Sequence, residues 1–141
     1  MLAAAKETEQ RCSKGKSKEE VADSVNWQAE AYFELGNYMA AKMEAERCLR
    51  IANYAVCHIT KGMALVEASK EKEGSEALLI GRRLATEQLA QIDIELRHSK
   101  TDERKKALLD SKRGWYTSKV KLANAYLKYA AAVKEKKLGK H

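Results

Sequence analysis

Proline is absent from all 141 residues of the chain. At an average usage of roughly 5 %, about seven prolines would be expected. Because proline lacks an N–H group and clashes with the preceding helical turn, it interrupts helices and central strands. Aromatic residues make up only 6 % of the chain, which disfavours an all-β fold because strands are enriched in aromatic and β-branched residues. We therefore predict an all-α protein built from long, uninterrupted helices.

Composition places the chain among globular proteins. Hydrophobic residues make up 45 % and charged residues 33 %, so an apolar core can form. No apolar run approaches the roughly 18 residues that a membrane-spanning helix needs. The first residues lack the pattern of a secretory signal, so we expect an intracellular, most simply cytoplasmic, protein. Three cysteines without metal-type spacing, Cys12, Cys48 and Cys57, are expected to be buried, reduced thiols.

Start and stop signals divide the chain into successive helices. Ser17 and Glu20 form the pattern of a capping box, and Gly36-Asn37 is typical of a helix end followed by a turn. The polar residues 69–74 are expected to form a loop. The predicted helices span residues 18–35, 38–52, 54–69, about 75–98 and 102–137. We expect a single domain over residues 1–141, with helical hairpins over 17–70 and a long antiparallel hairpin over 75–138.

The last predicted helix carries a heptad-like row of large apolar residues. Leu108, Trp115, Leu122 and Tyr129 lie seven residues apart, a spacing that keeps side chains on one face of a helix. We expect this row to form the seam of the long hairpin. Packing against the preceding helix and packing against a second chain are both compatible with the pattern.

The segment 22–55 resembles a tetratricopeptide repeat. The residues that carry the resemblance are Ala29, Tyr32, Gly36-Asn37-Tyr38, Ala41, Cys48 and Leu49. In this family small residues let two helices cross closely, a glycine makes the turn, and aromatic rings fill the space between hairpins. The usual terminal proline is replaced by Asn53, and residues 70–74 lack the turn signature. We expect a divergent array with one clear repeat; a helical bundle is the alternative.

The resemblance implies that the first helix of each hairpin lines a concave groove. In this chain the groove places are held by Asp23, Asn26, Glu30, Phe33, Glu34 and Glu67. Such a surface is acidic with one aromatic ring, so it is expected to prefer a basic or neutral helix or peptide. A merely solvated helix face is the alternative interpretation.

Positive charge is concentrated at the end of the chain. Residues 101–141 carry twelve basic and four acidic side chains, whereas the remainder is close to neutral. The candidate basic surface consists of Lys105, Lys112, Arg113, Trp115 and Lys119. Basic groups on one face beside aromatic rings suit an RNA backbone or an acidic protein surface. A lysine-rich, solvated helix face is the simpler interpretation.

No local motif for catalysis is present. The glycines are scattered rather than gathered in a phosphate-binding loop, and neither His-Glu-x-x-His nor Cys-x-x-Cys occurs. We expect no enzymatic activity, no metal and no cofactor. The leading hypothesis is a non-catalytic protein–protein interaction adaptor, or a small subunit of a larger assembly, that docks a partner helix or peptide. The alternative is an RNA-binding structural subunit of a ribonucleoprotein. Membrane association is not expected, and oligomerisation through the last helix is possible.

Overall fold

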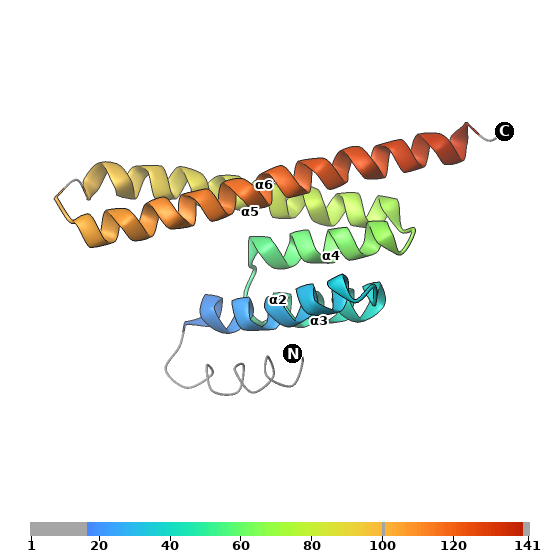
Figure 1. The fold of residues 1–141 in the computed structure, drawn as a ribbon, viewed down its shortest axis with the longest axis horizontal. Coiled ribbons are helices and arrows are strands. Elements are labelled where there is room, and N and C mark those ends of the chain that lie inside the picture. Colours follow the sequence, from blue (N-terminus) through green and yellow to red (C-terminus); the bar gives the residue numbers. More distant parts are fainter. Residues whose placement is uncertain (1–16, 100, 140–141) are drawn as a thin grey trace.

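The computed structural model describes residues 17–99 and 101–139. The helices in this part of the chain are α2 (Lys18–Glu34), α3 (Tyr38–Ile51), α4 (Ala55–Glu67), α5 (Glu71–His98) and α6 (Glu103–Leu138). No strand occurs in these residues, which confirms the all-α class and the long C-terminal helix. Each helix packs on the next one in sequence, and α4 also contacts α2 and α6. Helices α2, α4 and α6 therefore share one side of the stack (Figure 1).

Local signals define the helix starts. Ser17 Oγ accepts a hydrogen bond from the backbone N–H of Glu20 at 3.2 Å, as the capping-box pattern predicts. The side chains of Asn37 and Asp102 cap α3 and α6 in the same way. These bonds satisfy N–H groups that have no partner within the helix.

The two turns that join α2 to α3 and α4 to α5 have the same construction. Gly36 has φ +78° in the first, and Ser69, 33 residues later, has φ +66° in the second. In both turns the residue after the helix, and the two that follow it, donate backbone N–H groups to matching carbonyls of the last helical turn. The predicted loop over 69–74 is wrong, because α5 begins at Glu71. Ser69 adopts the left-handed conformation without a glycine, so the turn lacks its usual sequence signal.

The same spacing of 33 residues relates the sites where paired helices cross. Ala29 and Ala41 are fully buried in the first hairpin, and Gly62 and Gly74 hold the corresponding positions in the second. A Cβ atom added at Gly62 would lie 2.8 Å from the carbonyl oxygen of Gly74, and the converse distance is also 2.8 Å. Small residues at these places let the helix backbones approach closely.

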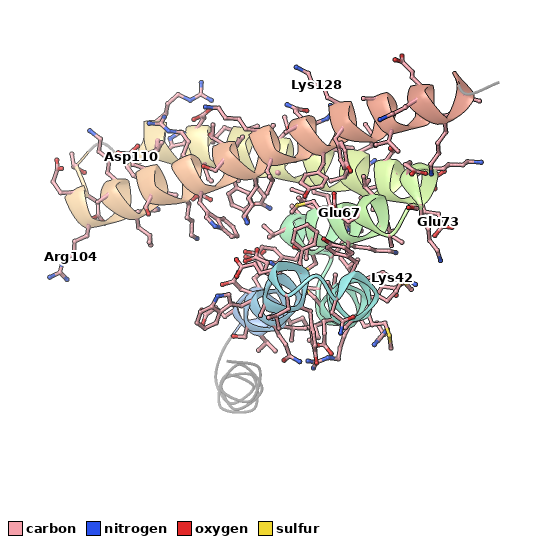
Figure 2. All side chains as sticks on the ribbon, turned by 45° about the vertical axis from the view of Figure 1, so that its right-hand side comes forward. Lys42, Glu67, Glu73, Arg104, Asp110 and Lys128 are labelled. Atoms are coloured by element: carbon pink, nitrogen blue, oxygen red, sulfur yellow. A yellow bond between two sulfur atoms is a disulfide. The ribbon has the colours of Figure 1, made fainter. Side chains whose placement is uncertain are left out.

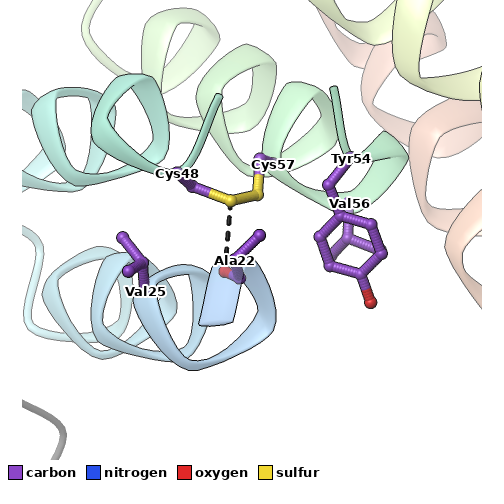
Figure 3. Packing of buried hydrophobic residues seen from close by; sticks show 6 residues of the cluster. All are labelled: Ala22, Val25, Cys48, Tyr54, Val56 and Cys57. Atoms are coloured by element: carbon purple, nitrogen blue, oxygen red, sulfur yellow. Dashed lines mark hydrogen bonds between the residues drawn. A yellow bond between two sulfur atoms is a disulfide. The ribbon is translucent and has the colours of Figure 1, made fainter. Parts of the chain in front are cut away.

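A disulfide joins the end of α3 to the start of α4. Cys48 and Cys57 are both fully buried and form an S–S bond with a Cα–Cα distance of 6.2 Å, within the range that such bonds allow. Figure 3 shows Cys48 Sγ beside the carbonyl oxygen of Ala22, at 3.1 Å. The predicted burial is confirmed for these two cysteines, but they are paired rather than reduced. Cys12 lies outside the described residues.

The buried row of α6 lies one residue later than predicted. Leu109, Tyr116, Ala123 and Ala130, also seven apart, are at most 7 % exposed and pack against α4 and α5. The predicted row is shifted by about 100° around the helix; for example, Leu108 is 59 % exposed. Large apolar residues suggested the wrong row because the closest part of the contact uses alanines. The helix packs on its own chain, so the intramolecular alternative is the one observed.

Candidate binding groove

One face of α2 carries most of the residues expected to line a groove. Asp23, Asn26, Glu30, Phe33 and Glu34 recur every three or four residues and therefore lie along one side of the helix. All five border recesses that open between α2 and α6. The sequence spacing and the three-dimensional placement agree for this set.

A facing stripe on α6 supplies the opposite wall. Trp115, Lys119, Leu122 and Tyr126 are spaced by four, three and four residues, which again defines one helix face. The Trp115 ring stacks on Tyr54 with centroids 6.1 Å apart. At the other end, the ring of Tyr126 meets Phe33 edge-on at 6.2 Å. The walls of the groove are thus joined by aromatic contacts at both ends.

An ion pair crosses the middle of the groove and separates two recesses. Lys119 Nζ lies 3.2 Å from Glu30 Oε1, and the two side chains are 18 % and 36 % exposed. Both residues border both recesses. Beyond them, the first recess, with a volume of about 240 Å³, is lined by Phe33, Glu34, Ile59, Thr60, Met63 and Leu122. We call it the apolar recess, because most of its side chains are hydrophobic.

The second recess is polar and aromatic. It has a volume of about 320 Å³ and, besides Glu30 and Lys119, is lined by Asp23, Asn26, Trp27 and Trp115. We call it the polar recess. Lys119 Nζ also lies 5.8 Å from the centroid of the Trp115 ring, which is the geometry of a cation–π contact. The polar recess therefore combines carboxylates, an amide and two indole rings around one ammonium group.

Burial perturbs the acidic side of the polar recess. The hydroxyl of Tyr54 donates a hydrogen bond to Asp23 Oδ1 at 3.2 Å. Burial raises the pKa of Asp23, and the nearby charge of Glu30 acts in the same direction, while Tyr54 and Lys119 oppose the rise. Tyr116, the next aromatic residue, has its pKa raised to about 12, mainly by burial. Removal of water from this end of the groove makes its charges sensitive to a new partner.

The remaining predicted groove residue lies beyond the two recesses. Glu67 ends α4, and its charge raises the pKa of Tyr126, although burial of that ring is the larger cause. It therefore lies toward the Tyr126 end of the groove and borders neither recess. Figure 2 shows Glu67 between α6 and the α2–α3 hairpin.

The residues proposed as a basic surface do not share one face. Trp115 and Lys119 belong to the groove, and Lys112 borders a shallow recess next to Trp115. Arg113 points toward α5, where it lies 3.6 Å from Asp93 and 3.0 Å from Asp110. Lys105 is exposed near the start of α6. The structure joins part of the predicted basic surface to the predicted acidic groove and separates the rest.

Several groove residues were not among the sequence candidates. Trp27, Tyr54, Met63 and Tyr126 all contribute to the groove or its ends. Trp27 follows Asp23 by four residues, so its helical spacing could have identified it. Tyr54 gives no such signal, because it precedes α4 and reaches Asp23 only through the fold of the chain.

Neither metal ligands nor a membrane helix is evident in the described part of the chain. Across residues 17–99 and 101–139, no three His, Cys, Asp or Glu side chains come together as a metal site would require. Within the same ranges, none of the helices has the length and apolar character needed to cross a bilayer. Comparison with models of protein families, with curated proteins and with solved structures gives no match to this chain.

Proposed function

We propose that this chain is a non-catalytic protein–protein interaction module that docks a helix or peptide in the groove between α2, α4 and α6. The observation that carries the proposal is the convergence of three helices on two adjoining recesses bordered by Asp23, Glu30 and Glu34. Apolar lining with a few placed polar groups is typical of binding sites. The surplus of carboxylates over the single Lys119 favours a partner with positive charge.

The repeated hairpin construction supports the same proposal. Two hairpins related by 33 residues use equivalent turns and equivalent small residues at the helix crossings. A tetratricopeptide-like array, which we propose for this chain, presents its first helices on a concave binding surface. In such a role the chain would act as an adaptor or as a small subunit of a larger assembly.

A reconstituted binding assay tests the proposal. A partner identified by affinity capture is purified, and its affinity is measured by titration calorimetry against the wild-type chain, Phe33→Ala and Glu34→Lys. Both variants change the apolar recess and are expected to weaken binding at least tenfold. Glu76→Lys provides a charge-matched control, because Glu76 is exposed on α5. Equal affinity for the wild-type chain and both groove variants would show that the partner binds elsewhere.

RNA binding through α6 is the less favoured alternative. Lys119 is already paired with Glu30, and Arg113 with Asp93 and Asp110, so fewer cations are available for phosphate groups. A salt titration with single-stranded RNA distinguishes the two functions. Binding whose logarithm falls steeply with the logarithm of salt concentration, and which Lys112→Glu abolishes, would favour the RNA function over the adaptor function.

A further inference from the structure

The polar recess already contains a cation that belongs to the chain itself. Lys119 Nζ is 3.2 Å from Glu30 Oε1 and 5.8 Å from the Trp115 ring centroid. A carboxylate on one side and an indole face on the other are the two groups that recognise a basic side chain. Lys119 reaches them from α6, across the groove from α2. The chain therefore displays, within its own fold, the contacts that a foreign cation would make.

Lys119 does not satisfy every acceptor in this recess. Asn26 is 2 % exposed, and its Nδ2 group donates to Glu30 Oε1 at 3.1 Å. Its Oδ1 atom is buried and has no hydrogen-bond partner among the described residues. A buried amide oxygen without a donor costs free energy, so a ligand that brings an N–H group to it gains binding energy. This orphaned acceptor and the neighbouring carboxylates point to a ligand with several donors.

Two further groups distinguish among cationic ligands. Trp27 and Trp115 both line the polar recess, and Trp27 is 64 % exposed. A guanidinium is planar, stacks on aromatic faces and carries five N–H donors, whereas an ammonium has three donors and no planar face. An arginine side chain can contact an indole, bind a carboxylate and still offer a donor to Asn26. Lysine can do less, as Lys119 shows by leaving Asn26 Oδ1 unpaired.

We propose that the polar recess is a subsite for an arginine side chain of the partner and that Lys119 occupies it until the partner displaces it. This inference rests on the proposed function, since it assigns the chemistry of one end of the same groove. The ion pair between Lys119 and Glu30 must break before the guanidinium can bind. Lys119 thus acts as an intramolecular competitor that lowers the affinity for weakly matching cations.

The tryptophans make the test specific. The chain contains two Trp residues, and both line the polar recess, so their indole N–H signals in ¹H–¹⁵N spectra report on this site. The probes are N-acetyl-arginine amide, N-acetyl-lysine amide and N-acetyl-citrulline amide, whose neutral urea has nearly the shape of the guanidinium. The arginine probe is expected to shift both indole signals and to bind at least threefold more tightly than the lysine probe. The citrulline probe is expected to bind at least tenfold more weakly than the arginine probe.

Two variants separate competition from simple contact. Lys119→Met keeps the aliphatic stem and removes the charge, so it is expected to increase the affinity for the arginine probe about tenfold. Glu30→Gln is expected to reduce it at least tenfold. The matched control is Lys128→Met, because Lys128 lies on the outer face of α6 (Figure 2), and its affinity should equal that of the wild-type chain. Thermal unfolding of each variant verifies that the fold is retained.

The outcomes distinguish this inference from the proposed function. Equal binding of the arginine and citrulline probes, unchanged or weaker binding to Lys119→Met, or indole signals that do not move would each overturn the arginine subsite. A partner that nevertheless depends on Phe33 would leave the groove function in place. Conversely, a specific arginine response without any polypeptide partner would support the subsite and contradict the adaptor role.

Discussion

Replacement of Gly62 by alanine tests the close crossing of α4 and α5. A Cβ atom at this position would lie 2.6 Å from Leu78 Cγ, 2.8 Å from the carbonyl oxygen of Gly74 and 2.9 Å from the backbone nitrogen of Leu78. Ordinary contacts of a Cβ atom begin at about 3.4 Å. The two helices must therefore separate by about half an ångström, because two of the three obstructing atoms are backbone atoms that cannot rotate away.

The expected cost follows from two opposing contributions. Overpacking of a tight core typically costs about 1–3 kcal/mol, and we take the upper value because the contact involves backbone. Alanine in a helix interior is about 1 kcal/mol more favourable than glycine. The free energy of unfolding is therefore expected to fall by about 2 kcal/mol in Gly62→Ala. The separation also weakens dispersion contacts of the buried Ile59, Val66 and Leu78.

Gly114 provides a matched control in α6. A Cβ atom at Gly114 would meet nothing within 4 Å, so Gly114→Ala keeps only the helix-propensity gain of about 1 kcal/mol. Urea unfolding followed by far-UV circular dichroism should place the two variants on opposite sides of the wild-type chain, with the same m-value. A Gly62→Ala chain as stable as Gly114→Ala would refute the close-crossing argument. The double variant Gly62→Ala, Gly74→Ala should lose less than the sum of its parts, because one separation relieves both contacts.

Three further predictions address the seam, the first helix cap and the buried acid. Leu109→Ala should lower the free energy of unfolding by about 2–5 kcal/mol and Leu108→Ala by less than about 1 kcal/mol, as measured by urea unfolding; the reverse order would restore the originally predicted row. Ser17→Ala should cost about 1 kcal/mol through loss of the N-cap, seen as a lower unfolding midpoint. Burial raises the folded-state pKa of Asp23 above 3.8, so its contribution to stability should decrease as pH rises from about 4 through that raised pKa. Asp23→Asn should remove this decrease in pH-dependent unfolding, and Tyr54→Phe should raise the pKa of Asp23 further in an NMR titration.

The sequence determined the helical class and most helix boundaries. Absence of proline permits helices of 28 and 36 residues, and local caps such as Ser17 and Asn37 specify their starts. These features depend on neighbours within one helical turn, and a linear pattern therefore contains them. The same holds for the acidic stripe of α2, because helical periodicity alone places Asp23, Asn26 and Glu30 on one face.

The tertiary structure decided how the pieces combine. Ser69 takes the backbone conformation that Gly36 takes one repeat earlier, so the second turn has no glycine signal. The buried row of α6 depends on alanines whose value arises only from the closeness of the opposing helix. The same rotation turns Trp115 and Lys119 toward the acidic stripe of α2. Two surfaces that the sequence presented as separate thereby become one groove, because contacts between residues about 90 positions apart are set by packing rather than by local pattern.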